Sequence, residues 1–69
     1  MATIYEKTGD KIRKLRKQKG LTQEELADLA KVDPKSIISI EAGKRNVTLK
    51  TLKKIALALD IQPSVLLES

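Results

Sequence analysis

The chain has 69 residues and a net charge of +5, from 14 lysines and arginines against 9 acidic residues. It contains no cysteine and no histidine, which excludes a disulfide framework, the usual zinc sites and nucleophilic triads that need either residue. Tyr5 is the only aromatic residue, so the base-stacking surface of RNA-recognition and single-strand-binding modules is missing. We expect one domain over residues 1–69, without a cofactor or a small-molecule ligand. We also expect a cytoplasmic location, because no signal peptide or membrane-length apolar run is evident.

The positive charge is concentrated near the start of the chain. Seven of the 14 basic residues lie between Lys7 and Lys19. A basic excess favours a polyanionic partner such as DNA or RNA, although a solvated helix surface has the same composition. We interpret Lys11, Lys14 and Lys17 as such a solvated surface rather than as a nucleic-acid contact.

The first predicted helix covers residues 8–19. Ile12 and Leu15 give it an apolar stripe, and Gly20 follows the last turn, where glycine commonly ends a helix. Ile4 and Tyr5 either extend this helix or form a separate anchor. If Ile4 and Tyr5 take neither role, residues 1–7 are expected to form a flexible N-terminal arm.

Two short helices are predicted next, over residues 22–31 and 33–42. Thr22 and Glu25 match a capping box, in which each side chain binds the backbone amide of the other residue. Asp33 is a favourable N-cap, and Pro34 fits the first helical position, where no hydrogen bond is lost. Gly43 follows the second of these helices and ends it.

The remainder of the chain is also helical in pattern. A helix starts at Thr48, and its apolar residues recur at intervals of three and four. These apolar residues are Leu49, Leu52, Ile55, Ala56 and Leu59. A last short turn or helix follows Pro63. Short helices without strand signals predict an all-α fold.

The pair of helices between Thr22 and Gly43 has the properties of a helix-turn-helix. The two helices are joined by about three residues in a basic, all-helical domain. Ala27 is small enough for the helices to cross closely, and Ile37 and Ile40 can pin the second helix to the first. Leu26 and Val32 complete this predicted apolar cluster.

Ile38 does not fit this cluster. It lies about 100° from Ile37 around the helix, so it should face outward or toward the rim of the core. Two roles remain open for it. Ile38 either covers the edge of the core or makes van der Waals contact with a thymine methyl group.

Two segments, IRKLRKQKGLTQEELA and IEAGKRNVTLKTLKKIALALDI, resemble the phage repressor and Cro type of helix-turn-helix domain, also called the XRE type. Within this type, DPKSIISIEAGKRNVTLKTL is similar to the controller proteins of restriction–modification systems. The resemblance implies a compact five-helix, lambda-repressor-like domain. Its helices 2 and 3 would form the reading unit, with helix 3 in the major groove of DNA.

The resemblance also implies roles for individual residues. Base-reading positions fall at Pro34, Lys35, Ser36, Ile38 and Ser39. Phosphate-contacting positions fall at Thr22, Gln23, Lys44, Arg45 and Asn46. Arg16 and Glu41 match a pair that forms an internal salt bridge.

The sequence departs from the family pattern at three positions. Lys31 stands where the turn between helices 2 and 3 usually has glycine, and a left-handed conformation there would cost about 1 kcal/mol. Pro34 and Ser39 replace longer polar side chains. Lys35 is therefore the best remaining hydrogen-bond donor to guanine.

Proteins of this type usually bind DNA as symmetric dimers, so we expect a homodimer. The expected dimer surface lies in the C-terminal part and consists of Ile61, Pro63, Val65, Leu66 and Leu67. Alternatively, Leu66 or Leu67 closes the core of the monomer. Both roles can hold at once, because adjacent helical residues cannot face the same direction. Protein concentration, acting through dimerisation, is the expected regulatory input.

The leading prediction is a regulator of transcription that binds double-stranded DNA with sequence specificity. It would act as a repressor or as a controller-type activator and repressor, on a palindromic operator, and would not be an enzyme. One alternative is an antitoxin or another protein-interaction module that uses the same fold. A further alternative is non-specific binding of DNA or RNA, which would show a steep salt dependence and little preference between duplexes.

Overall fold

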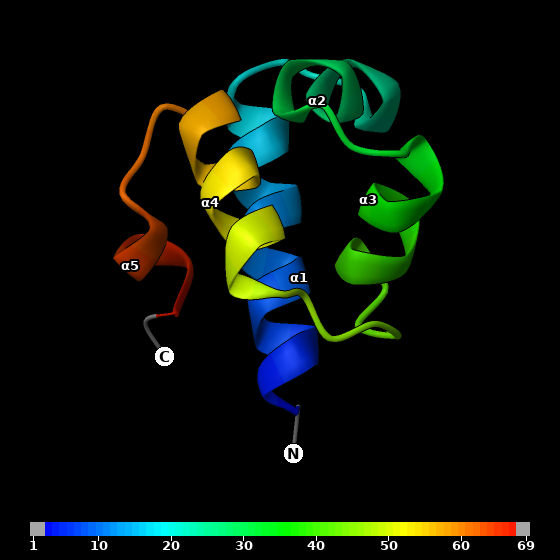
Figure 1. Ribbon diagram of the computed structural model, residues 1–69, viewed down its shortest axis with the longest axis vertical. Helices are drawn as coiled ribbons and strands as arrows, with labels where there is room; N and C mark the ends of the chain where they lie inside the picture. The colour runs from blue at the N-terminus through cyan, green and yellow to red at the C-terminus, as the bar shows by residue number, and fades with distance from the viewer. Residues whose placement is uncertain (1–2, 68–69) are drawn as a thin grey trace.

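The computed structural model describes residues 3–67 and contains five α-helices and no strand over that range (Figure 1). The helices are α1 (Ile4–Gln18), α2 (Gln23–Ala30), α3 (Pro34–Glu41), α4 (Leu49–Ala58) and α5 (Pro63–Leu67). The all-α class and the order of five helices are therefore as predicted. In Figure 1, α3 and α5 lie on opposite sides of the molecule, and α1 and α4 lie between them.

The start of α1 differs from the prediction. The Thr3 hydroxyl accepts a hydrogen bond from the Glu6 amide at 3.1 Å, and Glu6 Oε1 accepts one from the Thr3 amide at 2.9 Å. This second capping box starts the helix at Ile4 instead of residue 8. The expected flexible arm is therefore wrong for residues 3–7, and residues 1–2 lie outside the described residues.

Thr3 also acts on the ionisation of the Glu6 carboxyl group. The backbone amide of Thr3, and then its hydroxyl, lower the pKa of Glu6 below the ordinary glutamate value. Both bonds favour the charged carboxylate, which also lies in the first turn of α1, where negative charge is favourable.

The other helix starts agree with the predicted caps to within one residue. Thr22 and Glu25 form the predicted capping box at the start of α2. The Asp33 side chain accepts a hydrogen bond from the Lys35 amide, and the Thr48 side chain accepts one from the Thr51 amide. Short polar side chains thus satisfy amides that the first helical turn leaves without a partner.

The core is aliphatic and receives side chains from every helix. It consists of Ile12, Leu26, Ala27, Ala30, Ile37, Ile40, Leu52, Ile55, Ala56, Leu59 and Leu66. The apolar cluster predicted for the helix-turn-helix is confirmed, with Val32 packed at its edge. The prediction that Leu49 belongs to the apolar stripe of α4 is wrong. Leu49 is 60% exposed, because it stands at the first position of the helix, beyond the core.

Gly9 determines how closely α1 approaches α3. A Cβ atom at Gly9 would overlap the backbone carbonyl oxygen of Ile40 and lie 3.1 Å from that of Glu41. Glycine is therefore required in the middle of this helix, despite its low helical propensity. The close packing fixes the C-terminal end of α3 against α1.

Candidate nucleic-acid interface

The turn between α2 and α3 is built without glycine. Lys31 ends α2 in the left-handed conformation, with φ 57° and ψ 45°. The amide of Val32 then donates to the Ala27 carbonyl at 3.0 Å. The family resemblance implies a glycine at this position, and Lys31 adopts the left-handed conformation that glycine would favour, at a conformational cost.

α3 presents two different faces. Ile37 and Ile40 are buried in the core, as predicted. The residues predicted to read bases lie on the remaining surface, where Pro34, Lys35 and Ile38 are exposed and Ser36 and Ser39 are half-buried. Ile38 is 50% exposed, which confirms its outward orientation but leaves its two predicted roles open.

A buried ion pair attaches the end of α3 to α1. Arg16 Nε lies 2.7 Å from Glu41 Oε2, and Arg16 Nη2 donates to Glu41 Oε1 at 3.0 Å. The two side chains are only 10% and 3% exposed. Arg16 Nη1 also donates to the Leu21 carbonyl at 2.7 Å, and Gln23 Nε2 donates to Glu41 Oε1 at 3.2 Å. The expected pair is thus present, within a network that joins α1, α2 and α3.

Both side chains predicted to contact phosphate at the start of α2 already have partners within the protein. The side-chain amide of Gln23 donates a hydrogen bond to Glu41, and the Thr22 hydroxyl accepts one from the backbone amide of Glu25. The first turn of a helix nevertheless presents backbone N–H groups that no intrahelical carbonyl can reach. A phosphate contact at this end of α2 would therefore be made by the backbone.

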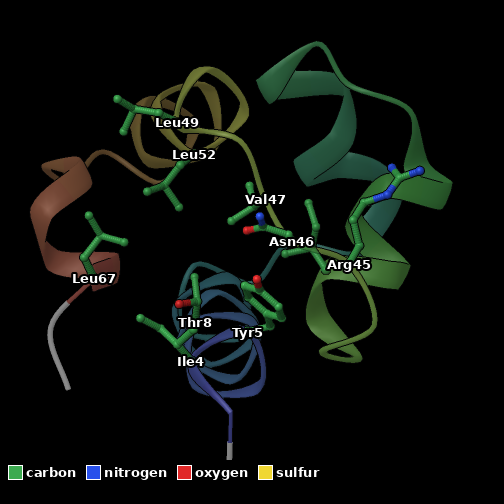
Figure 2. A pocket seen from close by; sticks show the side chains of 10 residues that line it. Ile4, Tyr5, Thr8, Arg45, Asn46, Val47, Leu49, Leu52 and Leu67 are labelled. Atoms are coloured by element: carbon green, nitrogen blue, oxygen red, sulfur yellow. The ribbon is translucent and has the colours of Figure 1, made fainter.

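The loop after α3 carries three further candidates. Lys44, Arg45 and Asn46 are all exposed. Arg45 Nη1 donates a hydrogen bond to Ser36 Oγ at 2.7 Å, which links the loop to α3. In Figure 2 the guanidinium group of Arg45 lies on the α3 side of the loop, away from Leu49 and Leu67. Arg45 therefore adds positive charge beside the predicted reading surface.

The structure also identifies two cations that sequence reasoning missed. Arg13 and Lys17 line a cleft between α1 and α3, with a volume of about 380 Å³. Arg13 has no predicted role in the sequence, and Lys17 was predicted to lie on a solvated surface. The spacing of Arg13 was the available signal, because Arg13 lies three residues before the inward-facing Arg16 and four before Lys17, and residues three or four apart are neighbours on a helix.

The predicted dimer residues do not share one environment. Leu66 is 1% exposed and belongs to the core, so it is not available to contact a second chain. Leu67 is 53% exposed, and Ile61, Pro63 and Val65 are half-buried. The alternative role of closing the core is therefore the observed one for Leu66.

Leu67 adjoins a small apolar hollow on the surface. Figure 2 shows Leu67, Leu49, Ile4 and Tyr5 around this hollow, which has a volume of about 190 Å³. These four side chains come from α1, α4 and α5 and are all exposed. They extend the predicted C-terminal apolar surface onto the start of α1.

Two kinds of feature are absent from residues 3–67. No group of three or more His, Cys, Asp or Glu side chains in that range could hold a metal ion. No helix in the described part of the chain is long and apolar enough to cross a membrane.

Comparison with protein families matches residues 12–66 to a model described as helix-turn-helix. The chain belongs to the helix-turn-helix family. Control protein C.MunI from Mycoplasma sp is 45% identical over 67 residues, which span 96% of this chain and 90% of that protein. The resemblance to restriction–modification controllers is thereby confirmed.

Solved structures of this helix-turn-helix family agree with the fold. The restriction–modification controller C.AhdI from Aeromonas hydrophila has a TM-score of 0.88 and 45% identity, over 90% of this chain and 94% of that chain. SinR, a master regulator of biofilm formation that was crystallised in complex with DNA, has a TM-score of 0.85 and 34% identity, over 88% of this chain and 98% of that chain. These relatives are regulators.

Proposed function

We propose that this helix-turn-helix protein is a sequence-specific regulator of transcription that binds double-stranded DNA as a homodimer. α3 would enter the major groove of a palindromic operator. One observation carries this proposal. Ile37 and Ile40 pack one side of α3 into the core, Glu41 binds Arg16 of α1, and the opposite side of α3 is left exposed. A DNA-reading helix needs this division between anchored and exposed positions. Such a regulator would act in the cytoplasm.

Base recognition would come mainly from the first half of α3. Lys35 is exposed at the second position of the helix and can donate to O6 and N7 of guanine. Ser36 and Ser39 could make shorter contacts. Pro34 and Ile38 would contribute apolar contacts, with Ile38 against a thymine methyl group.

Phosphate contacts would orient α3 in the groove. The backbone amides at the start of α2, beside Thr22 and Gln23, would bind one phosphate. Lys44, Arg45 and Asn46 would bind the backbone on the other side of α3. The similarity to SinR, which was crystallised in complex with DNA, supports this assignment of a DNA-binding role.

Dimerisation would use the exposed apolar surface that includes Leu67 and its half-buried neighbours Ile61, Pro63 and Val65. One short recognition helix reads only a few base pairs, so a second copy would supply the rest of the specificity. Half-sites in the operator would then lie about 10 base pairs apart.

Selection of bound duplexes from a random pool, at near-physiological salt, tests this proposal. Wild type should yield a palindromic consensus, and Lys35→Ala should lose discrimination of about 1–3 kcal/mol at one position in each half-site. Lys14→Ala is the matched control, because Lys14 is an exposed lysine on α1 that pairs with Asp10. Absence of any enrichment for wild type would refute the proposal and favour a protein partner.

Ile38→Ala provides a separate test of the apolar contact. The variant should discriminate less between thymine and cytosine at one position, while its unfolding free energy changes little because Ile38 is half exposed. Unchanged discrimination at every position would instead assign Ile38 to the edge of the core.

A further inference from the structure

The cleft between α1 and α3 has one positively charged wall and one apolar wall. Arg13 and Lys17 form the α1 wall, four residues apart on one face of the helix. Ile38 and Ala42, at the end of α3, form the opposite wall. Two cations and the exposed side chain of Ile38, on the proposed reading helix, therefore line the same cleft.

The charges in this cleft are not balanced. Arg16 and Glu41 also line it, but they neutralise each other in the buried ion pair. Among residues 3–67, neither Arg13 nor Lys17 has an acidic group within ion-pair distance, whereas Lys14 pairs with Asp10 at 3.0 Å. The cleft thus carries two positive charges in excess, on exposed and adaptable side chains.

We propose that Arg13 and Lys17 bind the phosphate backbone of DNA along the edge of the groove that α3 reads. This inference rests on the proposed function. Residues four apart on a helix are separated by about 6 Å along its axis, which allows two neighbouring phosphates of one strand to be contacted. Because Ile38 forms the other wall, the strand in the cleft borders the bases that α3 faces.

Contacts of this kind carry no sequence information. They raise affinity for every duplex, and they fix the position of α1 against the strand. Each phosphate contact releases condensed counterions, so it adds about 0.9 to the slope of log affinity against log salt concentration. Arg13 and Lys17 supply four such contacts in the proposed homodimer, two from each protomer, and should therefore account for about 3.6 of that slope.

The test compares two double variants that each remove two positive charges. Arg13→Ala/Lys17→Ala removes the cleft cations, and Lys14→Ala/Lys54→Ala removes two exposed cations that do not line the cleft. Fluorescence anisotropy measures binding of the selected operator and of a scrambled duplex over a range of salt concentrations. Circular dichroism verifies that both variants remain folded.

The cleft variant should lose about 3.6 from the salt slope and, as a dimer, bind the operator about 900-fold more weakly at about 0.15 M salt. Its ratio of operator to scrambled affinity should stay that of wild type. The inference is overturned if the slope is unchanged, if the control variant loses as much, or if the cleft variant loses base preference. A wild type that does not prefer its operator would instead contradict the proposed function itself.

Discussion

The buried ion pair between Arg16 and Glu41 makes the strongest prediction about stability. Replacing Glu41 with glutamine removes the negative charge but keeps a side chain of nearly the same size. The Glu41 carboxylate accepts three hydrogen bonds, from Arg16 Nε, Arg16 Nη2 and Gln23 Nε2. The amide has one oxygen, and its NH2 group would face the donors of Arg16.

The loss of unfolding free energy in Glu41→Gln follows from the burial of both partners of the ion pair. Arg16 is 10% exposed and would remain charged in the core without its counter-ion. Removing one partner of a buried pair costs about 3–5 kcal/mol. Because the amide oxygen of glutamine can still accept a hydrogen bond, we expect Glu41→Gln to cost about 3 kcal/mol. A chain of this length has a total stability of roughly 3–10 kcal/mol, so the variant loses a large fraction of it.

Urea unfolding followed by circular dichroism measures this loss directly. The double variant Arg16→Met/Glu41→Leu is the control, because it removes both charges. It leaves the Leu21 carbonyl without its donor and the Gln23 side-chain amide without its acceptor, at about 1 kcal/mol each. The double variant should therefore be more stable than Glu41→Gln. If Glu41→Gln lost less than about 1 kcal/mol, the reasoning about the uncompensated charge would be refuted.

Three further predictions concern the backbone and the helix caps. Gly9→Ala should destabilise the fold by about 1–3 kcal/mol, although alanine favours helices, because its Cβ overlaps the Ile40 carbonyl; thermal unfolding measures this. Lys31→Gly should raise the unfolding free energy by up to about 1 kcal/mol in the same assay, since it relieves the left-handed strain. The pKa of Glu6 is lowered by hydrogen bonds from Thr3, so its contribution is present above the ordinary glutamate pKa and is lost as pH falls through the lowered value. Amide exchange in the first turn of α1 should therefore accelerate in acid, and unchanged protection there would contradict this coupling.

Local signals predicted the helices well. The polar caps at Thr22, Asp33 and Thr48 located the starts of three helices to within one residue. Ile4 and Tyr5 extend α1, which was one of the two alternatives left open for them, and the same capping pattern that identified α2 is present at Thr3 and Glu6.

Features that depend on how helices cross were harder to predict. Periodicity could not decide which of Leu66 and Leu67 is buried, since the answer depends on where α5 meets α1 and α4. It also placed Leu49 in a stripe that extends past the edge of the core. The cleft with Arg13 and Lys17 lies between α1 and α3, whose close approach at Gly9 no local sequence pattern reports.

The anchoring of α3 has a consequence for how this protein can change over time. Ile37, Ile40 and Glu41 hold the helix in place, and none of them is among the positions proposed to contact bases. Lys35 and Ser39 can therefore be exchanged at little cost to stability, since surface substitutions away from such anchors usually change it by about 0.5 kcal/mol or less. A new operator preference is accessible by mutation without a compensating change in the core, which separates the evolution of specificity from that of the fold.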